Sequence, residues 1–165
     1  MLVLGIDPGT AITGYGLVRE DEEGLTLVDY GVITTAAGRP LPERLQAIYQ
    51  GLADVARKHQ PQQAAVEELF FSRNVRTALS VGHARGVTLL ALVDAGLAIH
   101  EYKPLEIKQA ITGYGGAGKQ QMQEMVRLLL NLDAVPEPDD AADAVAVAVC
   151  HIHSARMTEL IKDAR

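Results

Sequence analysis

The apolar residues of this 165-residue chain follow a strand pattern at first and a mixed helix-and-strand pattern after about residue 40. The run 2–6 is continuously apolar and ends in a turn-forming Asp-Pro-Gly at 7–9, as expected of a buried strand. The runs 13–18 and 25–34 favour strands and flank the polar segment 20–24. The first part of the chain therefore predicts three antiparallel strands joined by hairpins.

Helices and short strands alternate in the rest of the chain. Apolar residues recur at helical spacing over 40–59, while 64–66 and 98–102 are short apolar runs suited to strands. Further helices are predicted at 77–95, 104–111 and 119–130. From 139 to about 156 the Ala-Val alternation would suit a strand, but the Pro-Asp-Asp start and the length favour a helix. These elements predict an α/β fold with a mixed sheet.

Composition limits the class of protein and its compartment. Apolar residues make up 48% and charged residues 22%, which is typical of a soluble globular domain, and no apolar run is long enough to span a membrane. The first residues lack the basic flank and cleavage site of a signal peptide. The single cysteine, Cys150, excludes an internal disulfide and fits a reducing compartment. We therefore expect one domain, in the cytoplasm, with no membrane partner.

The net charge of −6 is unusual for a protein that binds nucleic acid, but the charge is unevenly distributed. Between residues 71 and 127 there are seven basic and four acidic side chains, a local charge of +3. Local potential steers a polyanion more than total charge does. This pattern permits DNA binding without requiring it, and an ordinary mixed surface remains the alternative.

Acidic residues occur at three places where the predicted elements could bring them together. Asp7 ends the first strand, and the pair Glu67 and Glu68 ends the fourth. Neighbours on a strand point to opposite faces, so only one glutamate can face Asp7, and spacing does not decide which. Asp140 and Asp143 share one face at the start of the last helix. Separately, these residues could cap a turn, face solvent or form a capping box.

Their joint occurrence favours a metal site. One glutamate and the three aspartates would form a cluster of like charges that requires cations. Hard oxygen ligands favour Mg²⁺ or Mn²⁺ over zinc. Two such ions per active site, about 3.5–4 Å apart, form the usual clamp for phosphodiester hydrolysis.

The chain closely resembles the RuvC family of Holliday-junction resolvases over essentially its whole length. Several independent motifs occur in the family's order, which makes the resemblance specific. The matching segments are 5–9, 13–16, 66–70, Asn74, 82–87, 107–109, Lys119 and 140–144.

The resemblance implies a fold, a single domain and a ligand set. The fold would be RNase H-like, with a mixed five-stranded sheet, three antiparallel strands then parallel strands, and helices on both faces. Residues 1–165 would form a single nuclease domain. Asp7, Glu67, Asp140 and Asp143 would be the catalytic metal ligands, and the resemblance selects Glu67 over Glu68. Some relatives carry His where this chain has Asp140.

The resemblance also implies an activity and partners. The chain would be an endodeoxyribonuclease that acts as a homodimer on four-way DNA junctions, in recombination and repair. It would nick two opposed strands and leave 5′-phosphate and 3′-hydroxyl ends. A branch-migration motor complex of the RuvA–RuvB type would work with it.

Five residues are candidate DNA contacts. By resemblance, Phe70 stacks on a base at the opened junction centre, where every base offers a π-face. Lys108 and Lys119 match family lysines near the scissile phosphate, where a cation stabilises developing charge. Arg73 and Arg76 are candidate backbone contacts. Core or dimer packing for the phenylalanine, and ordinary surface positions for the lysines, are the alternatives.

Two other motifs and two other classes of protein are less consistent with the sequence. The segment 113–120 nearly matches a P-loop, but Gln120 replaces the Ser or Thr that holds Mg²⁺, and a helix is predicted before it. His151 and His153 point apart on a helix, so we expect unrelated surface or interface residues. A sugar-kinase or actin-like phosphotransferase would need two such domains, and a DNA-binding module without catalysis would not need all four carboxylates.

Overall fold

The computed structural model describes residues 1–68 and 75–163. All the predicted elements are present there, and the ambiguous last segment is a helix of 25 residues. The elements are β1 (Leu2–Asp7), β2 (Ile12–Asp21), β3 (Gly24–Thr34), α1 (Leu41–His59), β4 (Gln63–Glu67), α2 (Val75–Asp94), β5 (Ala98–Tyr102), α3 (Pro104–Thr112), α4 (Lys119–Leu129) and α5 (Asp139–Asp163).

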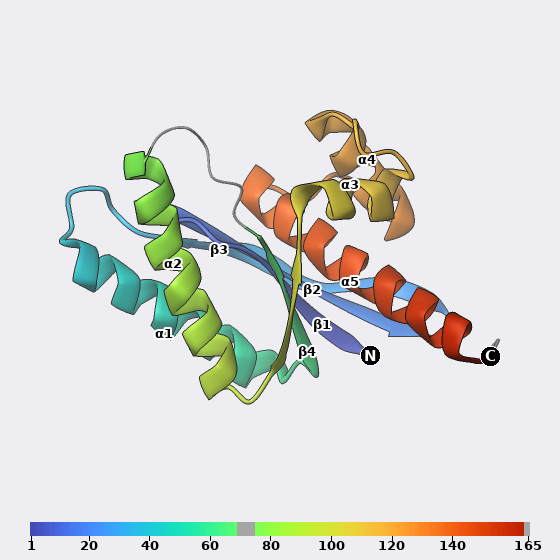
Figure 1. The fold of residues 1–165 in the computed structure, drawn as a ribbon, viewed down its shortest axis with the longest axis horizontal. Coiled ribbons are helices and arrows are strands. Elements are labelled where there is room, and N and C mark those ends of the chain that lie inside the picture. Colours follow the sequence, from blue (N-terminus) through green and yellow to red (C-terminus); the bar gives the residue numbers. More distant parts are fainter. Residues whose placement is uncertain (69–74, 164–165) are drawn as a thin grey trace.

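One five-stranded sheet organises the described chain, with strand order β3-β2-β1-β4-β5 (Figure 1). The first three strands pair antiparallel, as the hairpin pattern predicted. β4 joins β1 in parallel and β5 joins β4 in parallel, each after a helix that crosses the sheet. The predicted mixed sheet is therefore confirmed, and β1 lies at its centre.

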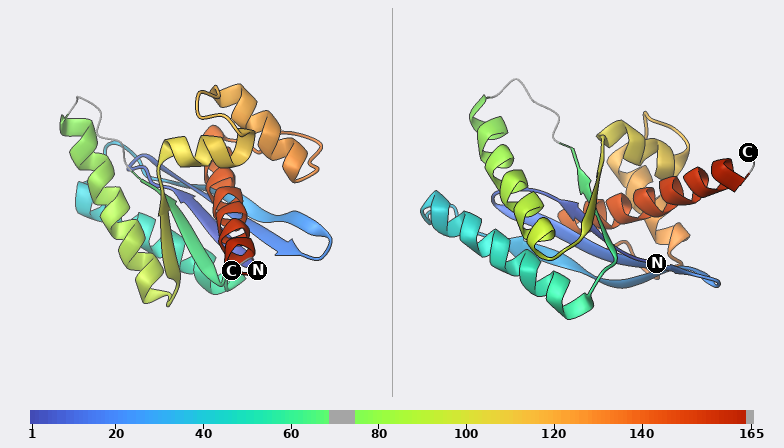
Figure 2. Two further views of the ribbon diagram at one scale, coloured as in Figure 1. Left: turned by 45° about the vertical axis from the view of Figure 1, so that its right-hand side comes forward. Right: turned by 60° about the horizontal axis from the view of Figure 1, so that its bottom comes forward.

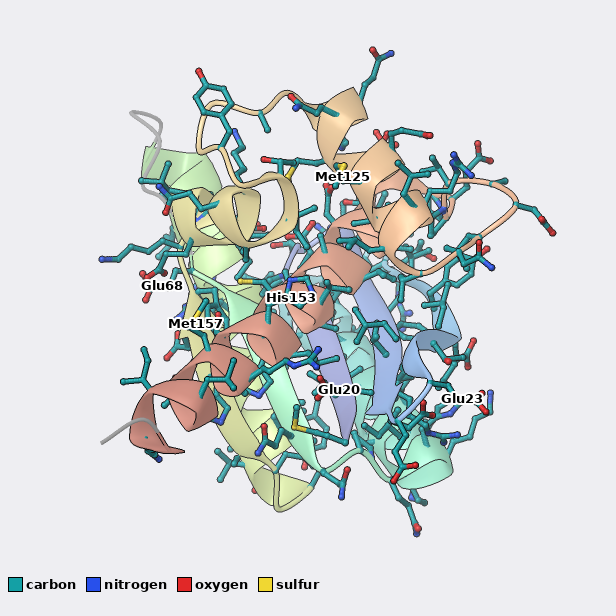
Figure 3. The ribbon with its side chains drawn as sticks, turned by 90° about the vertical axis from the view of Figure 1, so that its right-hand side faces the viewer. Glu20, Glu23, Glu68, Met125, His153 and Met157 are labelled. Atoms are coloured by element: carbon teal, nitrogen blue, oxygen red, sulfur yellow. The ribbon has the colours of Figure 1, made fainter. Side chains whose placement is uncertain are left out.

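Helices cover both faces of the sheet, as predicted. Figures 1 and 2 show α1 and α2 on one face and α5 on the other, with α3 and α4 beside the first half of α5. Figure 3 looks at the α5 side, with Met125 on α4 and His153 on α5. Alternation along β1 sends Leu4 and Ile6 into the core under α1 and α2, while Val3 packs in the core under α5. The central strand is thus buried on both sides.

Small residues let α5 lie unusually close to the sheet. A Cβ atom on Gly5 would stand 2.1 Å from the carbonyl oxygen of Ala144, and one on Gly14 would stand 1.9 Å from that of Asp140. Neither distance is possible for a real side chain, so these glycines are required by close approach. Because α5 is enclosed by the sheet on one side and by α3 and α4 on the other, its stretch 144–150 is apolar and buried all round. That explains why its sequence pattern was ambiguous.

His151 corrects one expectation. The side chain is buried, with 2% of its surface exposed, rather than lying at the surface. Nε2 donates to Oε1 of Gln63 at 2.5 Å, and the hydroxyl of Tyr102 donates to Nδ1 at 2.7 Å. Burial lowers the pKa of His151 to about 4, so the imidazole is neutral. His153 points elsewhere and approaches the carbonyl of Ala110 at 3.1 Å, as the helical spacing predicted.

Two expectations drawn from composition can be compared with the structure. Cys150 is fully buried and packs as a small hydrophobic residue in the core under α5. In the part of the chain that the structure describes, no helix is both long enough and apolar enough to cross a membrane.

Candidate active site

Two of the predicted carboxylates lie at the carboxyl ends of neighbouring parallel strands. In the ladder between β1 and β4, Gly5 pairs with Ala65 and the next residues pair in turn. Ala65 packs in the core under α5. Because side chains alternate along a strand, Glu67 and Asp7 point to that same face. The structure thus gives a physical reason for choosing Glu67 over Glu68, which follows the end of the strand.

The other two carboxylates lie on the first turns of α5. Close contact between Gly14 and the backbone of Asp140 fixes the start of this helix against the end of the sheet where β1 terminates. Asp143 lies one turn further on and shares a cavity of about 220 Å³ with Glu67. Residues from β1, β4 and α5 therefore meet at one end of the sheet.

The acidic groups of this site change one another's pKa values. The pKa of Asp7 is raised to about 7, first by burial, then by the charges of Glu67, Asp143 and Asp140, and last by a hydrogen bond with Glu67. Burial, and then the charge of Asp143, raise the pKa of Glu67. The pKa of Asp143 is also raised, mainly by burial. Such a cluster resists full ionisation unless positive charge is supplied.

Part of that positive charge comes from Lys119. Its ammonium group forms ion pairs with Asp139 at 3.0 Å and with Asp143 at 3.3 Å. The amide of Gln123 also donates to Asp139, at 2.8 Å. Hydrogen bonding to Asp139 is the largest cause that raises the pKa of Lys119, so the lysine stays charged. Sequence reasoning had treated Asp139 only as part of a helix start.

The donor set fits a hard divalent cation. All four acidic side chains offer oxygen atoms, and their mutual repulsion would be relieved by Mg²⁺ or Mn²⁺. Among residues 1–68 and 75–163, no three His, Cys, Asp or Glu side chains already stand in an arrangement that would hold a metal ion. Binding would therefore require the carboxylates to turn toward a shared ion.

The structure describes only some of the predicted DNA contacts. Lys108 lines the cavity with Glu67, and its charge lowers the pKa of that glutamate against the larger effect of burial. Phe70 and Arg73 lie outside the described residues, as does the side chain of Arg76.

Sequence reasoning missed a further cation, Arg44 at the start of α1. It lines an open pocket of about 530 Å³ together with Asp140, on a second side of the carboxylate group. No local pattern marked this arginine, because its neighbours there come from distant parts of the chain. The P-loop-like segment 113–120 follows helix α3, as predicted, rather than the strand that precedes a P-loop.

Comparison with known proteins agrees with this geometry. The family model described as crossover junction endodeoxyribonuclease RuvC matches residues 3–151. The chain is 59% identical over 155 residues to the crossover junction endodeoxyribonuclease RuvC of Chloroflexus aurantiacus, covering 94% of each chain. It is 57% identical over 162 residues to that of Roseiflexus sp., covering 98% of this chain and 96% of the relative.

A solved structure supports the same assignment. T. thermophilus RuvC in complex with Holliday junction substrate superposes with a TM-score of 0.90 at 38% identity, covering 96% of both chains. The mixed sheet and helical layers seen here are thus those of an RNase H-like fold. The chain belongs to the RuvC family of crossover junction endodeoxyribonucleases.

Proposed function

We propose that this chain is a structure-selective endodeoxyribonuclease that resolves Holliday junctions in recombination and DNA repair. It would nick two opposed strands symmetrically, by two-metal-ion hydrolysis of the phosphodiester, with the whole chain as one nuclease domain. The observation that carries the proposal is the meeting of Asp7, Glu67 and Asp143 beside Asp140 at one end of the sheet. Family membership supplies the junction as the substrate class.

Asp7, Glu67, Asp140 and Asp143 would hold two ions, Mg²⁺ or Mn²⁺. When bound, the ions would activate the attacking water and stabilise the leaving 3′-oxygen. The protein's own contribution is to bring carboxylates from three elements together in a partly buried site. Their raised pKa values mean that the carboxyl groups resist full ionisation on their own, so a divalent cation that supplies positive charge would be favoured there.

Two lysines would act on the phosphate itself. Lys108 and Lys119 line the same cavity as Glu67 and Asp143, so a phosphate seated at the carboxylates would lie within their reach. Each ammonium group would stabilise the negative charge that develops during attack. We further propose that Phe70 stacks on a base at the junction centre, and that Arg73 and Arg76 contact the backbone.

A cleavage assay tests this proposal. A synthetic four-way junction and a linear duplex of the same sequence are each incubated with the protein and Mg²⁺, Mn²⁺ or EDTA. We expect paired nicks in opposed strands of the junction, products that a ligase can seal, and no cutting in EDTA. Equal cutting of the linear duplex would contradict junction selectivity, and cutting in EDTA would contradict metal dependence.

We propose that the active form is a homodimer, which matches the two-fold symmetry of a junction cut twice. Helix α2 offers a suitable surface, which we call the α2 stripe: Leu79, Gly82, Gly86, Leu90 and Val93. Its three large side chains are 61%, 54% and 60% exposed, and a Cβ on either glycine would meet open space. Spacings of three and four residues put all five on one side of the helix. Exposed apolar residues beside small ones would let a second copy of the helix approach closely.

A charge on the α2 stripe should break the dimer. We expect Leu90→Glu to be monomeric in sedimentation measurements and to lose paired nicking. Leu128→Glu on α4 is the matched control, because Leu128 is 55% exposed and lies outside the stripe. A Leu90→Glu protein that remains dimeric would place the interface elsewhere.

Two further expectations concern a partner complex and the location of the protein in the cell. We propose that a branch-migration motor complex of the RuvA–RuvB type works with this nuclease. A DNA substrate and a single buried cysteine support the expected cytoplasmic location.

A further inference from the structure

The pocket beside Arg44 lies outside the part of the site assigned so far. Its volume is about 530 Å³, and its walls come from the β1–β2 turn, α1, α2 and α5. Asp140 lines one side, and Thr10, Arg44 and Ser80 are among the other lining residues. Because Asp140 belongs to the carboxylate group, a strand whose phosphate sits at that group could continue into this pocket.

Arg44 is held in the pocket by a chain of hydrogen bonds. Its Nε donates to Oγ1 of Thr35 at 2.8 Å, and that hydroxyl donates to the carbonyl oxygen of Thr10 at 2.5 Å. Thr10 in turn hydrogen-bonds to Ser80 on α2 at 2.7 Å. Both threonines are buried, so the arginine is tied to the interior. A guanidinium fixed in this way loses little further freedom when it binds a ligand.

The charge of Arg44 is not used within the described part of the protein. No carboxylate among those residues forms an ion pair with it, although Asp140 lines the same pocket. Arg39, just before α1, differs because it pairs with Glu43 at 3.3 Å. With Nε occupied by Thr35, the terminal nitrogen atoms of Arg44 remain as donors. Two such N–H groups match the two non-bridging oxygens of a phosphate.

We propose that this pocket binds a phosphate of the DNA strand flanking the scissile one, with Arg44 as the residue that pairs with it. The inference rests on the proposed nuclease function, because it takes the carboxylate group as the place of cutting. Cations would then stand on two sides of that group, with Lys108 and Lys119 in one cavity and Arg44 in the other. Contacts on both sides would hold the strand in register over the carboxylates.

Salt dependence of binding is the direct test. Junction affinity is measured in EDTA over a series of salt concentrations for wild type, Arg44→Gln, Arg44→Lys and the control Arg39→Gln. We expect Arg44→Gln to weaken binding about tenfold, and to flatten the plot of log affinity against log salt by about 0.9 per subunit. Arg44→Lys should keep the wild-type slope, since the charge is retained, and Arg39→Gln should match wild type throughout.

A second variant separates loss of the contact from misfolding. Thr35→Val removes the hydroxyl that accepts from Arg44 while keeping the shape of the side chain, and should weaken binding with little change in the salt slope. Thermal midpoints of all variants are measured alongside. If Arg44→Gln is folded and shows the affinity and slope of Arg39→Gln, the phosphate pocket is wrong. That result would leave the nuclease proposal intact, because the nuclease proposal fails only if the wild type does not cut junctions.

Discussion

Asp7→Asn is expected to reduce junction cutting by about 10³-fold or more while leaving junction binding within about twofold of wild type. Asp7 is the member of the group whose pKa all three other carboxylates, Glu67, Asp143 and Asp140, raise. An amide keeps the shape of the side chain but loses the charge that would hold a divalent cation. Single-turnover cutting in Mg²⁺ and in Mn²⁺, with binding measured in EDTA, gives the two readouts.

The control for this variant is Glu68→Gln. Glu68 is the neighbouring acid, and it follows the end of β4 rather than sharing the face of Asp7. We expect it to cut at close to the wild-type rate. Asp7→Asn should also melt no lower than wild type in metal-free buffer, because it removes a buried charge from a repulsive cluster. Normal cutting by Asp7→Asn would contradict the catalytic assignment.

Gly14→Ala is expected to lower both stability and activity. Its Cβ would lie 1.9 Å from the carbonyl oxygen of Asp140, so α5 must move away from the sheet. Overpacking of this kind lowers the free energy of unfolding by about 1–3 kcal/mol or more. The shift would also displace the acidic end of α5 from Asp7, so cutting should fall beyond what unfolding explains.

Chemical denaturation gives the free energy of unfolding. Single-turnover cutting, measured at a temperature at which both variants are folded, gives the activity. Gly38→Ala is the matched control, because a Cβ there meets nothing within 4 Å and its backbone is not left-handed. If Gly14→Ala has the stability and cutting rate of Gly38→Ala, then close approach of α5 does not position the site.

Much of this fold could be predicted from local patterns. Alternating and continuous apolar runs located the strands, and helical spacing located α1, because those elements bury one face or both faces of a sheet. The helix α5 was harder, since enclosure on all sides removes the periodic signal and leaves the acidic start as the guide. Its identification depended on the Pro-Asp-Asp start and on the length of the segment rather than on periodicity.

The site was predictable only in part. Strand alternation showed that only one of Glu67 and Glu68 can face Asp7, but the choice needed the register between β1 and β4 or a resemblance. Arg44 could not have been found, because its pocket brings it together with Ser80 and Asp140, which are distant in sequence. The burial of His151 was missed for the same reason, since its partners Gln63 and Tyr102 are distant in sequence.

Location of bound Mn²⁺ tests the central idea most directly. Crystals of the protein grown or soaked with Mn²⁺ can be examined by anomalous diffraction, which identifies the ion independently of any cutting assay. We expect Mn²⁺ within about 2.0–2.6 Å of carboxylate oxygens of Asp7 and at least one partner from β4 or α5. The account would be contradicted if the protein cuts junctions in Mn²⁺ but the crystals show no Mn²⁺ bound to these carboxylates.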